Sequence, residues 1–193
     1  MKEIFDLQWK LNEYTLKNIG MDYAKAVADP ELNAVWLENY RKALSAELAE
    51  LVRDVHEHGI GSKNGMIEVV DMLHFLLSLS HIVAIDPAAV TIGPVNGASF
   101  TDCVLKTFLA LDTLQNSVKW KWWARGGGYK EDQARQGVLQ LWKCFEELCA
   151  VFSMDFDTVK RVYMAKNALN FRRQNLDYNE ETKTEADNQA LDI

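Results

Sequence analysis

The stretch IEVVDMLHFLLSL, residues 67–79, limits the possible fold more than any other part of this sequence. It is apolar enough for a protein core, yet Glu68, Asp71 and His74 recur in it every three residues. Residues at this spacing share one face of an α-helix, whereas along a β-strand they would alternate between faces. A carboxylate in an apolar interior is costly unless it is compensated. The stretch therefore predicts a buried helix whose polar stripe meets a partner from elsewhere in the chain.

Long helices are also expected for the rest of the chain, because 193 residues contain only 3 prolines and 10 glycines. With 48% hydrophobic residues, the chain can bury one sizeable core. Asp29-Pro30 and Ser99 or Thr101 are helix start signals. We expect an all-α bundle of one domain over residues 1–178, followed by a polar, mobile tail over residues 179–193. The apolar spacing predicts helices at about residues 3–18, 31–56, 65–83, 100–123, 131–152 and 155–172.

The net charge of −7 disfavours binding to nucleic acid or to an anionic membrane as the main activity. No segment reaches about 18 consecutive apolar residues, so no membrane-spanning helix is expected. The N-terminal residues do not resemble a secretory signal. Cys103, Cys144 and Cys149 lack metal-binding or redox spacing, and we interpret them as reduced packing thiols of a cytoplasmic protein.

A second acid pair, Glu47 and Glu50, precedes the polar stripe and is also three residues apart. If the two helices pack antiparallel through the short GIGSKNG connection, Glu47, Glu50, Glu68 and Asp71 come together. Four carboxylates at close range repel each other, and a cation relieves this repulsion. Oxygen ligands without cysteine favour Mg²⁺, or Mn²⁺, over Zn²⁺. The alternative for Glu47 and Glu50 is an ordinary solvated helix face.

The stretch YMAKNALNFRRQNLDY, residues 163–178, concentrates cations and side-chain amides in an otherwise acidic chain. Arginine and lysine suit phosphate oxygens, and amides suit the edge of a base. Gln8 and Asn12 place two more amides on one face of the first helix. These residues suggest a pocket for a nucleotide, although a cationic helix end or exposed amides are the simpler alternatives.

Together these motifs resemble those of the all-α dimeric dUTPases, a family of MazG-like nucleoside triphosphate pyrophosphohydrolases that includes phage dUTPases and dCTPases. The resemblance covers residues 4–82 and 160–178, and its most specific part lies near the C-terminus. The shared motifs are Glu47-x-x-Glu50, Glu68-x-x-Asp71-x-x-His74-Phe75 and Lys166-Asn167-x-x-Asn170-x-x-Arg173-Gln174, with Tyr178 after them.

The resemblance implies a bundle of about six helices, a homodimer, and Mg²⁺-dependent cleavage of dUTP to dUMP and pyrophosphate, with dUDP as a second candidate substrate. It implies a small-molecule nucleotide as the partner, in the cytoplasm of a bacterium or a phage-infected host. The four carboxylates would bind metal ions, and Glu50, or else Glu47, would activate the attacking water. Gln8, Asn12, His74, Asn167 and Asn170 would contact the base, Lys166 and Arg173 the phosphates, and Tyr178 would close over the sugar or phosphates.

One feature departs from the family pattern. Family members often carry a Trp/Lys-rich segment between the two acid pairs, but here the similar string, KWKWWARGGGYKED, comes later in the chain. Its Lys121 and Arg125 would reach the phosphates if the string forms a mobile lid, and its tryptophans otherwise suit a core or a dimer interface. The departure leaves dCTP or a broader set of deoxynucleoside triphosphates open as substrates. A nucleotide-binding or dimerisation module without turnover is the alternative of another class.

Overall fold

The computed structural model describes residues 1–175, and the tail expected over residues 179–193 lies outside this part of the chain. The described residues form seven α-helices, one short 3-10 helix and no strand. The elements are α1 (Lys2–Asn18), α2 (Tyr23–Ala28), α3 (Pro30–His58), α4 (Lys63–Ile82), η1 (Pro87–Ala89), α5 (Phe100–Gln115), α6 (Glu131–Val151) and α7 (Phe156–Asn175). The prediction of an all-α fold is confirmed, and α2 is the additional helix.

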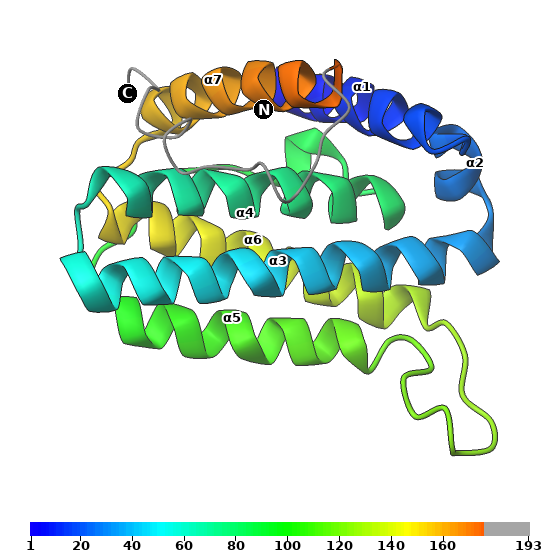
Figure 1. Cartoon of the computed structure of the whole chain (residues 1–193). Helices are drawn as coiled ribbons and strands as arrows, with labels where there is room; N and C mark the ends of the chain where they lie inside the picture. The colour runs from blue at the N-terminus through cyan, green and yellow to red at the C-terminus, as the bar shows by residue number, and fades with distance from the viewer. Residues whose placement is uncertain (176–193) are drawn as a thin grey trace.

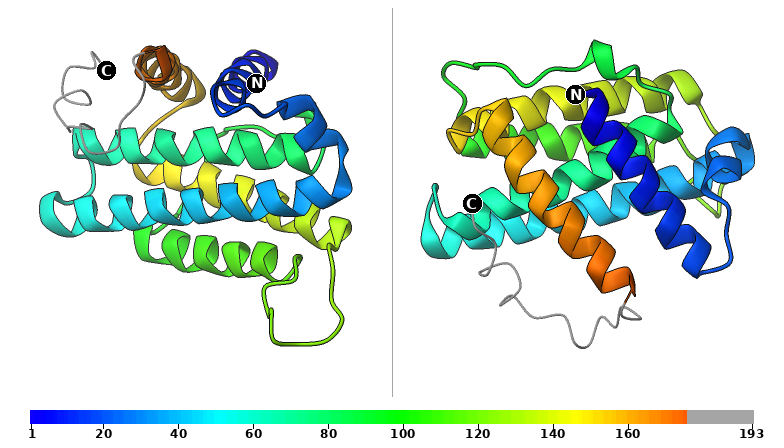
Figure 2. Two further views of the ribbon diagram at one scale, coloured as in Figure 1. Left: turned by 45° about the vertical axis from the view of Figure 1, so that its right-hand side comes forward. Right: turned by 90° about the horizontal axis from the view of Figure 1, so that it is seen from above.

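Two antiparallel helix pairs, α3 with α4 and α5 with α6, form the body of the molecule (Figure 1). Helices α1 and α7 contact each other and cross this body on one side, as Figure 2 shows from above. Helix α5 lies on the opposite side, away from α1 and α7. This arrangement brings α1, α3, α4 and α7 around one region of the bundle.

Helix α4 is the central helix and is buried on nearly every side, because α1, α3, α6 and α7 all pack against it. Leu73, Leu77 and Leu79 are completely buried in the core. In the described part of the chain, α4 alone is long and apolar enough to cross a membrane by length and composition, but 78% of that stretch is buried inside the bundle. Its apolar character is accounted for by this central position.

Local hydrogen bonds explain where the long helices begin. Oδ1 of Asp29 accepts the backbone N–H of Glu31 at 2.8 Å and of Leu32 at 3.3 Å, and Pro30 occupies the first turn of α3. The side chain of Ser99 caps α5 in a similar way. Both starts confirm the sequence-based prediction.

The helix expected over residues 100–123 ends earlier, at Gln115. Nδ2 of Asn116 donates to the carbonyl of Asp112 at 3.0 Å, and the hydroxyl of Ser117 donates to the carbonyl of Leu114 at 2.6 Å. In a continued helix the carbonyl of Leu114 would accept from the N–H of Val118, but here it accepts from the hydroxyl and the backbone N–H of Ser117. Residues 116–130, here called the arm, therefore leave the bundle as a projecting loop (Figure 1).

Candidate functional site

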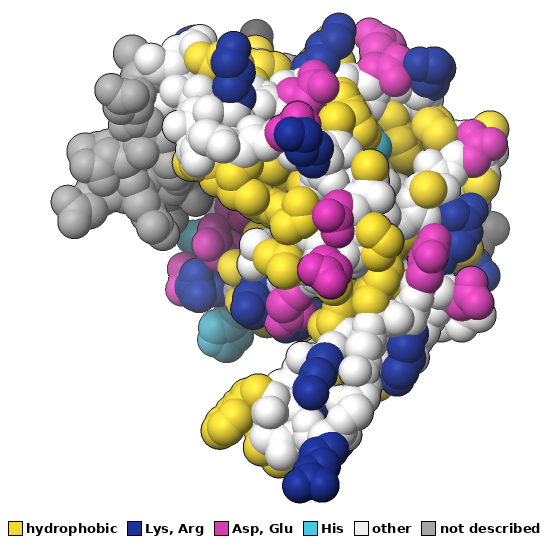
Figure 3. Space-filling model, turned by 90° about the vertical axis from the view of Figure 1, so that its right-hand side faces the viewer, with side chains coloured by type: hydrophobic (Ala, Val, Ile, Leu, Met, Phe, Trp, Pro, Cys, Tyr) yellow, Lys and Arg dark blue, Asp and Glu magenta, His cyan; other side chains and the backbone are white. Residues whose placement is uncertain are grey.

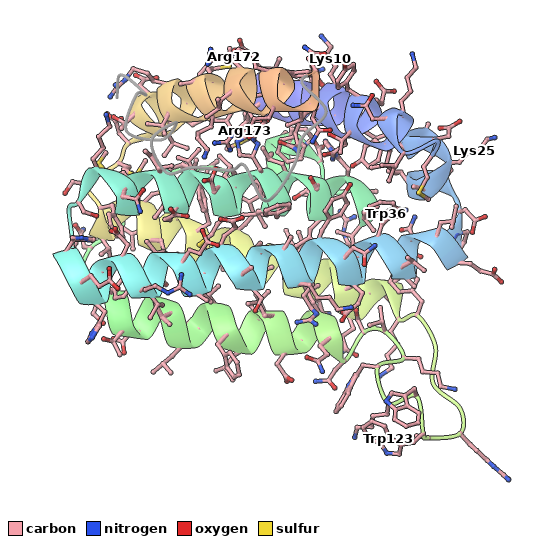
Figure 4. All side chains as sticks on the ribbon, in the orientation of Figure 1. Lys10, Lys25, Trp36, Trp123, Arg172 and Arg173 are labelled. Atoms are coloured by element: carbon pink, nitrogen blue, oxygen red, sulfur yellow. The ribbon has the colours of Figure 1, made fainter. Side chains whose placement is uncertain are left out.

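A cavity of about 410 Å³ lies between α1, α3, α4 and α7. Figure 4 shows Arg173 pointing from α7 toward α4, whereas its neighbour Arg172 points away from the bundle. Trp36 and Tyr40 of α3 line the cavity from the other side. The cavity walls include these sequence-predicted residues: Gln8, Asn12, Glu47, Asp71, His74, Lys166, Asn170 and Arg173.

Three of the four expected carboxylates meet beside this cavity. Glu47 and Glu50 from α3 and Glu68 from α4 each bring one carboxylate oxygen within 4.8 Å of the others. Glu68 is only 5% exposed, and the other two are partly buried. Three carboxylates at this separation repel each other strongly in a partly desolvated site. Their oxygens are the ligands that hard divalent cations prefer, so this cluster can hold such a cation.

The fourth expected carboxylate, Asp71, has a different neighbour in the structure. Its Oδ2 lies 2.7 Å from Nζ of Lys166 in α7, and the two side chains are only 15% and 3% exposed. Such a buried ion pair is favourable only while both partners are present, because a lone buried charge is poorly solvated. The pair joins α4 to α7 at the wall of the cavity.

A buried polar group behind the glutamates links α3 to the start of α4. Asp54, 5% exposed, accepts a hydrogen bond from the hydroxyl of Ser62 and one from Nδ2 of Asn64 at 3.2 Å, and its Oδ1 lies 3.0 Å from Nδ1 of His58. Burial alone would raise the pKa of Asp54, but the hydrogen bonds from these neighbours outweigh it and hold the pKa below its usual value. Nδ2 of Asn64 also donates to Oε1 of Glu68 at 3.3 Å. The group therefore orients a member of the glutamate cluster.

Replacing Asn64 by Ala is expected to lower the affinity for Mn²⁺ by about 10-fold, because hydrogen bonds to ligating carboxylates hold them in position. Isothermal titration of Mn²⁺ into the nucleotide-free protein measures this. Asn39→Ala, at an exposed position on α3, is the matched control and should leave the affinity unchanged. Equal Mn²⁺ affinities for the two variants would contradict the orienting role of Asn64.

A second polar network lies on the α1 side of the cavity and is almost fully buried. Nε2 of Gln8 donates to Oδ1 of Asn12 at 2.8 Å. Oε1 of Gln8 accepts from the hydroxyl of Tyr163 at 3.0 Å and lies 2.8 Å from Nδ1 of His74. Nδ2 of Asn12 donates to Oγ of Ser78 at 3.0 Å. The structure thus brings Gln8, Asn12 and His74 into one hydrogen-bonded group.

This network determines which ring nitrogen of His74 carries the hydrogen, and burial keeps the ring neutral. A carbonyl oxygen such as Oε1 of Gln8 only accepts, so Nδ1 of His74 carries the hydrogen. Burial, and secondarily the charge of Lys166, lowers the pKa of His74 to about 3, so the ring is neutral at pH 7. Its other nitrogen, Nε2, is then an acceptor, and it is buried without a hydrogen-bond partner among residues 1–175. The ring is also stacked on Tyr163, with centroids 4.5 Å apart.

The remaining expected site residues are divided between the cavity and other places. Asn170 lines the cavity, whereas Nδ2 of Asn167 donates to the hydroxyl of Tyr163 at 3.3 Å behind it. Lys121 and Arg125 lie on the arm, which contributes no residue to the cavity walls described. Tyr178 lies outside the described residues.

Several polar residues of the site were not expected from the sequence. Ser78 follows His74 by four residues and Tyr163 precedes Asn167 by four, so helical spacing places each pair on one face. Asp54 follows Glu50 by four residues in the same way. This spacing could have indicated that Ser78, Tyr163 and Asp54 belong to the site. Such residues are too common on helices for the spacing to single them out.

A family model with the description dUTPase matches residues 1–178. No curated protein and no solved structure gave a match.

Proposed function

Because the chain belongs to the dUTPase family and is thus a dUTP pyrophosphohydrolase, we propose that it converts dUTP to dUMP and pyrophosphate in the cavity between α1, α3, α4 and α7, in a Mg²⁺-dependent reaction. The observation that carries the proposal is the meeting of three functional groups around one space. The glutamate cluster lies beside it, the cations Lys166 and Arg173 line it, and the neutral His74 faces it.

The metal site is proposed to consist of Glu47, Glu50, Glu68 and Asp71. The family implies a divalent cation, and the three clustered glutamates offer it oxygen ligands without sulfur or imidazole, which favours Mg²⁺ or Mn²⁺. Asp71 lies one turn from Glu68 on the same face of α4. When bound, the cation neutralises charge on the triphosphate and makes water a better nucleophile.

Glu50 is proposed to take the proton from the attacking water, with Glu47 as the alternative base. The water oxygen forms a new bond to the α-phosphorus, and the bond from this phosphorus to the oxygen that bridges it to the β-phosphorus breaks. Pyrophosphate leaves with that bridging oxygen. Lys166 and Arg173 are proposed to bind phosphate oxygens, Arg173 through its planar pair of N–H groups. No covalent intermediate is needed, because positioning and charge stabilisation carry most phosphoryl transfer.

His74 supports uracil over cytosine as the base. Uracil carries an N–H at ring position 3, whereas cytosine has an acceptor nitrogen there. The buried acceptor Nε2 of His74 can accept a hydrogen bond from the N–H of uracil. With cytosine, Nε2 would face another acceptor and stay without a hydrogen bond. Gln8 and Asn12 hold this ring in its tautomer and, with Asn167 and Asn170, are proposed to complete the contacts to the base.

Replacing His74 by Phe is expected to lower kcat/KM for dUTP by about 10- to 100-fold and to change that for dCTP much less, because the variant loses a buried acceptor. A panel of the four common deoxynucleoside triphosphates with dUTP and dUDP, with detection of pyrophosphate and phosphate, measures the preference. His56→Phe, at an exposed histidine of α3, is the control. An unchanged preference for dUTP over dCTP in His74→Phe would contradict the role of Nε2.

The same panel separates the remaining candidates. Turnover of dCTP or of several bases would favour a broader pyrophosphohydrolase, and thermal stabilisation by a non-hydrolysable analogue without turnover would favour a binding module. We further propose that the protein is a homodimer and acts in the cytoplasm of a bacterium or a phage-infected host. The three cysteines support a reducing compartment, because all are free and buried.

A further inference from the structure

Outside the cavity, five large apolar side chains of α5 and the arm are exposed. Leu105, Phe108 and Leu109 of α5 are 56%, 64% and 64% exposed, and their spacing aligns them as one stripe along the helix. In the arm, Trp122 is 83% exposed and Trp123 is 63% exposed. Contiguous apolar surface of this kind marks an interaction site more often than single exposed side chains do.

The arm holds its tryptophans in place by its own contacts. The backbone N–H of Lys130 donates to the carbonyl of Ser117 at 2.8 Å and closes the base of the arm. The ring of Trp123 meets those of Trp120 and Trp122 edge-on, at 5.8 and 5.5 Å between centroids. Preorganised aromatic side chains lose little entropy on binding, which is typical of residues that dominate interfaces.

The charges of the two parts are complementary. The arm carries four cations, Lys119, Lys121, Arg125 and Lys130, and no acidic residue. Figure 3 shows Lys and Arg side chains together with hydrophobic ones on this projecting loop. The stripe on α5 lies between two exposed acidic residues, Asp102 and Asp112, and the one cation of α5, Lys106, is paired with Glu147 of α6 at 2.8 Å. One chain therefore presents a basic aromatic arm and an acidic apolar stripe.

We propose that this surface binds a second copy of the chain, with the arm of each protomer lying on the α5 stripe of its partner. A two-fold axis makes both contacts at once, as in most homodimers. Covering the five apolar side chains removes on the order of 600 Å² per copy, and the rest of the arm brings this toward the roughly 800 Å² of a standard interface. Asp102 and Asp112 disfavour nucleic acid or an anionic membrane on the same stripe.

This interface rests on the homodimer proposed above. Its test measures the mass of the assembly and not catalysis, so the interface can be disproved while the dUTPase activity is retained. Sedimentation velocity of the full chain at micromolar concentration should give twice the chain mass of 22.0 kDa. Phe108→Asp on α5 and Trp122→Ser on the arm should each raise the dimer dissociation constant at least about 100-fold. Ile60→Asp, at an exposed apolar side chain on the α3–α4 turn, is the control and should stay dimeric. Circular dichroism and the thermal midpoint check that each variant is folded.

Mixing the two interface variants tests which surfaces meet. The Phe108→Asp protomer keeps its arm and the Trp122→Ser protomer keeps its stripe, so the mixture should form heterodimers through one intact contact. A monomeric wild type, or folded variants that remain dimers as tight as the wild type, would overturn the proposal. A mixture that stays monomeric would overturn the pairing of arm with stripe. If the protein were a monomer whose arm binds single-stranded DNA or anionic vesicles, the arm would be a polyanion-binding site and not part of a dimer interface.

Discussion

Glu50→Gln is expected to lower kcat for dUTP by about 10³-fold, because the neutral amide cannot accept the proton of the attacking water. The amide keeps an oxygen that can ligate a cation, and Glu47 and Glu68 remain in the cluster. The affinity for Mn²⁺ should therefore fall much less than the rate. Pyrophosphate release at saturating dUTP and Mg²⁺ measures the first quantity, and titration of Mn²⁺ without nucleotide measures the second.

Glu57→Gln is the matched control for this experiment, because Glu57 is an exposed glutamate on the same helix. It should leave both quantities unchanged. If Glu50→Gln retained more than half of the wild-type rate and Glu47→Gln lost activity about 10³-fold, the base would be Glu47. If neither variant lost activity, the glutamate cluster would not be the catalytic site.

The sequence predicted the helical frame well where local signals are strong. The Asp29-Pro30 start of α3 and the Ser99 cap of α5 depend on hydrogen bonds within a few residues, so they can be read from the chain. Helix α2 was missed because its six residues are too short for an apolar period to stand out, and only the cap at Asp22 marks its start. The end of α5 was misplaced because residues that suit a helix continue past Gln115, whereas the hydroxyl and the backbone N–H of Ser117 both donate to the carbonyl of Leu114 and close the helix there.

The site could be predicted only as far as helical spacing reaches. The spacing within α3 placed Glu47 and Glu50 on one face of that helix, and a short connection to α4 suggested that Glu68 lies opposite them. The structure brings the three side chains together. The ion pair of Asp71 with Lys166 depends on how α7 crosses α4, which no local pattern specifies. The direction of the arm is a similar case, because the order of Trp and Lys residues does not indicate which surface a loop approaches.

The ion pair between Asp71 and Lys166 is expected to contribute strongly to the stability of the protein. Replacing Lys166 by Met is expected to destabilise the protein by about 3–5 kcal/mol, because it removes the ammonium group that lies 2.7 Å from the carboxylate of Asp71 in a nearly closed site. For a chain of this length, such a loss lowers the thermal midpoint by roughly 10 °C. Calorimetry or thermal melting without metal or nucleotide measures the change.

Two comparisons separate the buried charge from the loss of a lysine as such. Lys160→Met removes an ion pair of the same type between α7 and α1, to Glu3 at 2.6 Å, but those side chains are 37% and 57% exposed, so the cost should stay below about 1 kcal/mol. Adding Asp71→Asn to Lys166→Met removes the carboxylate charge that Lys166 balanced and should recover part of the lost stability. Mg²⁺ should also raise the midpoint of Lys166→Met if Asp71 is a metal ligand, because the cation then replaces the ammonium beside the carboxylate. Equal midpoints for the Lys166→Met and Lys160→Met variants would show that the charge of Asp71 is well solvated without Lys166.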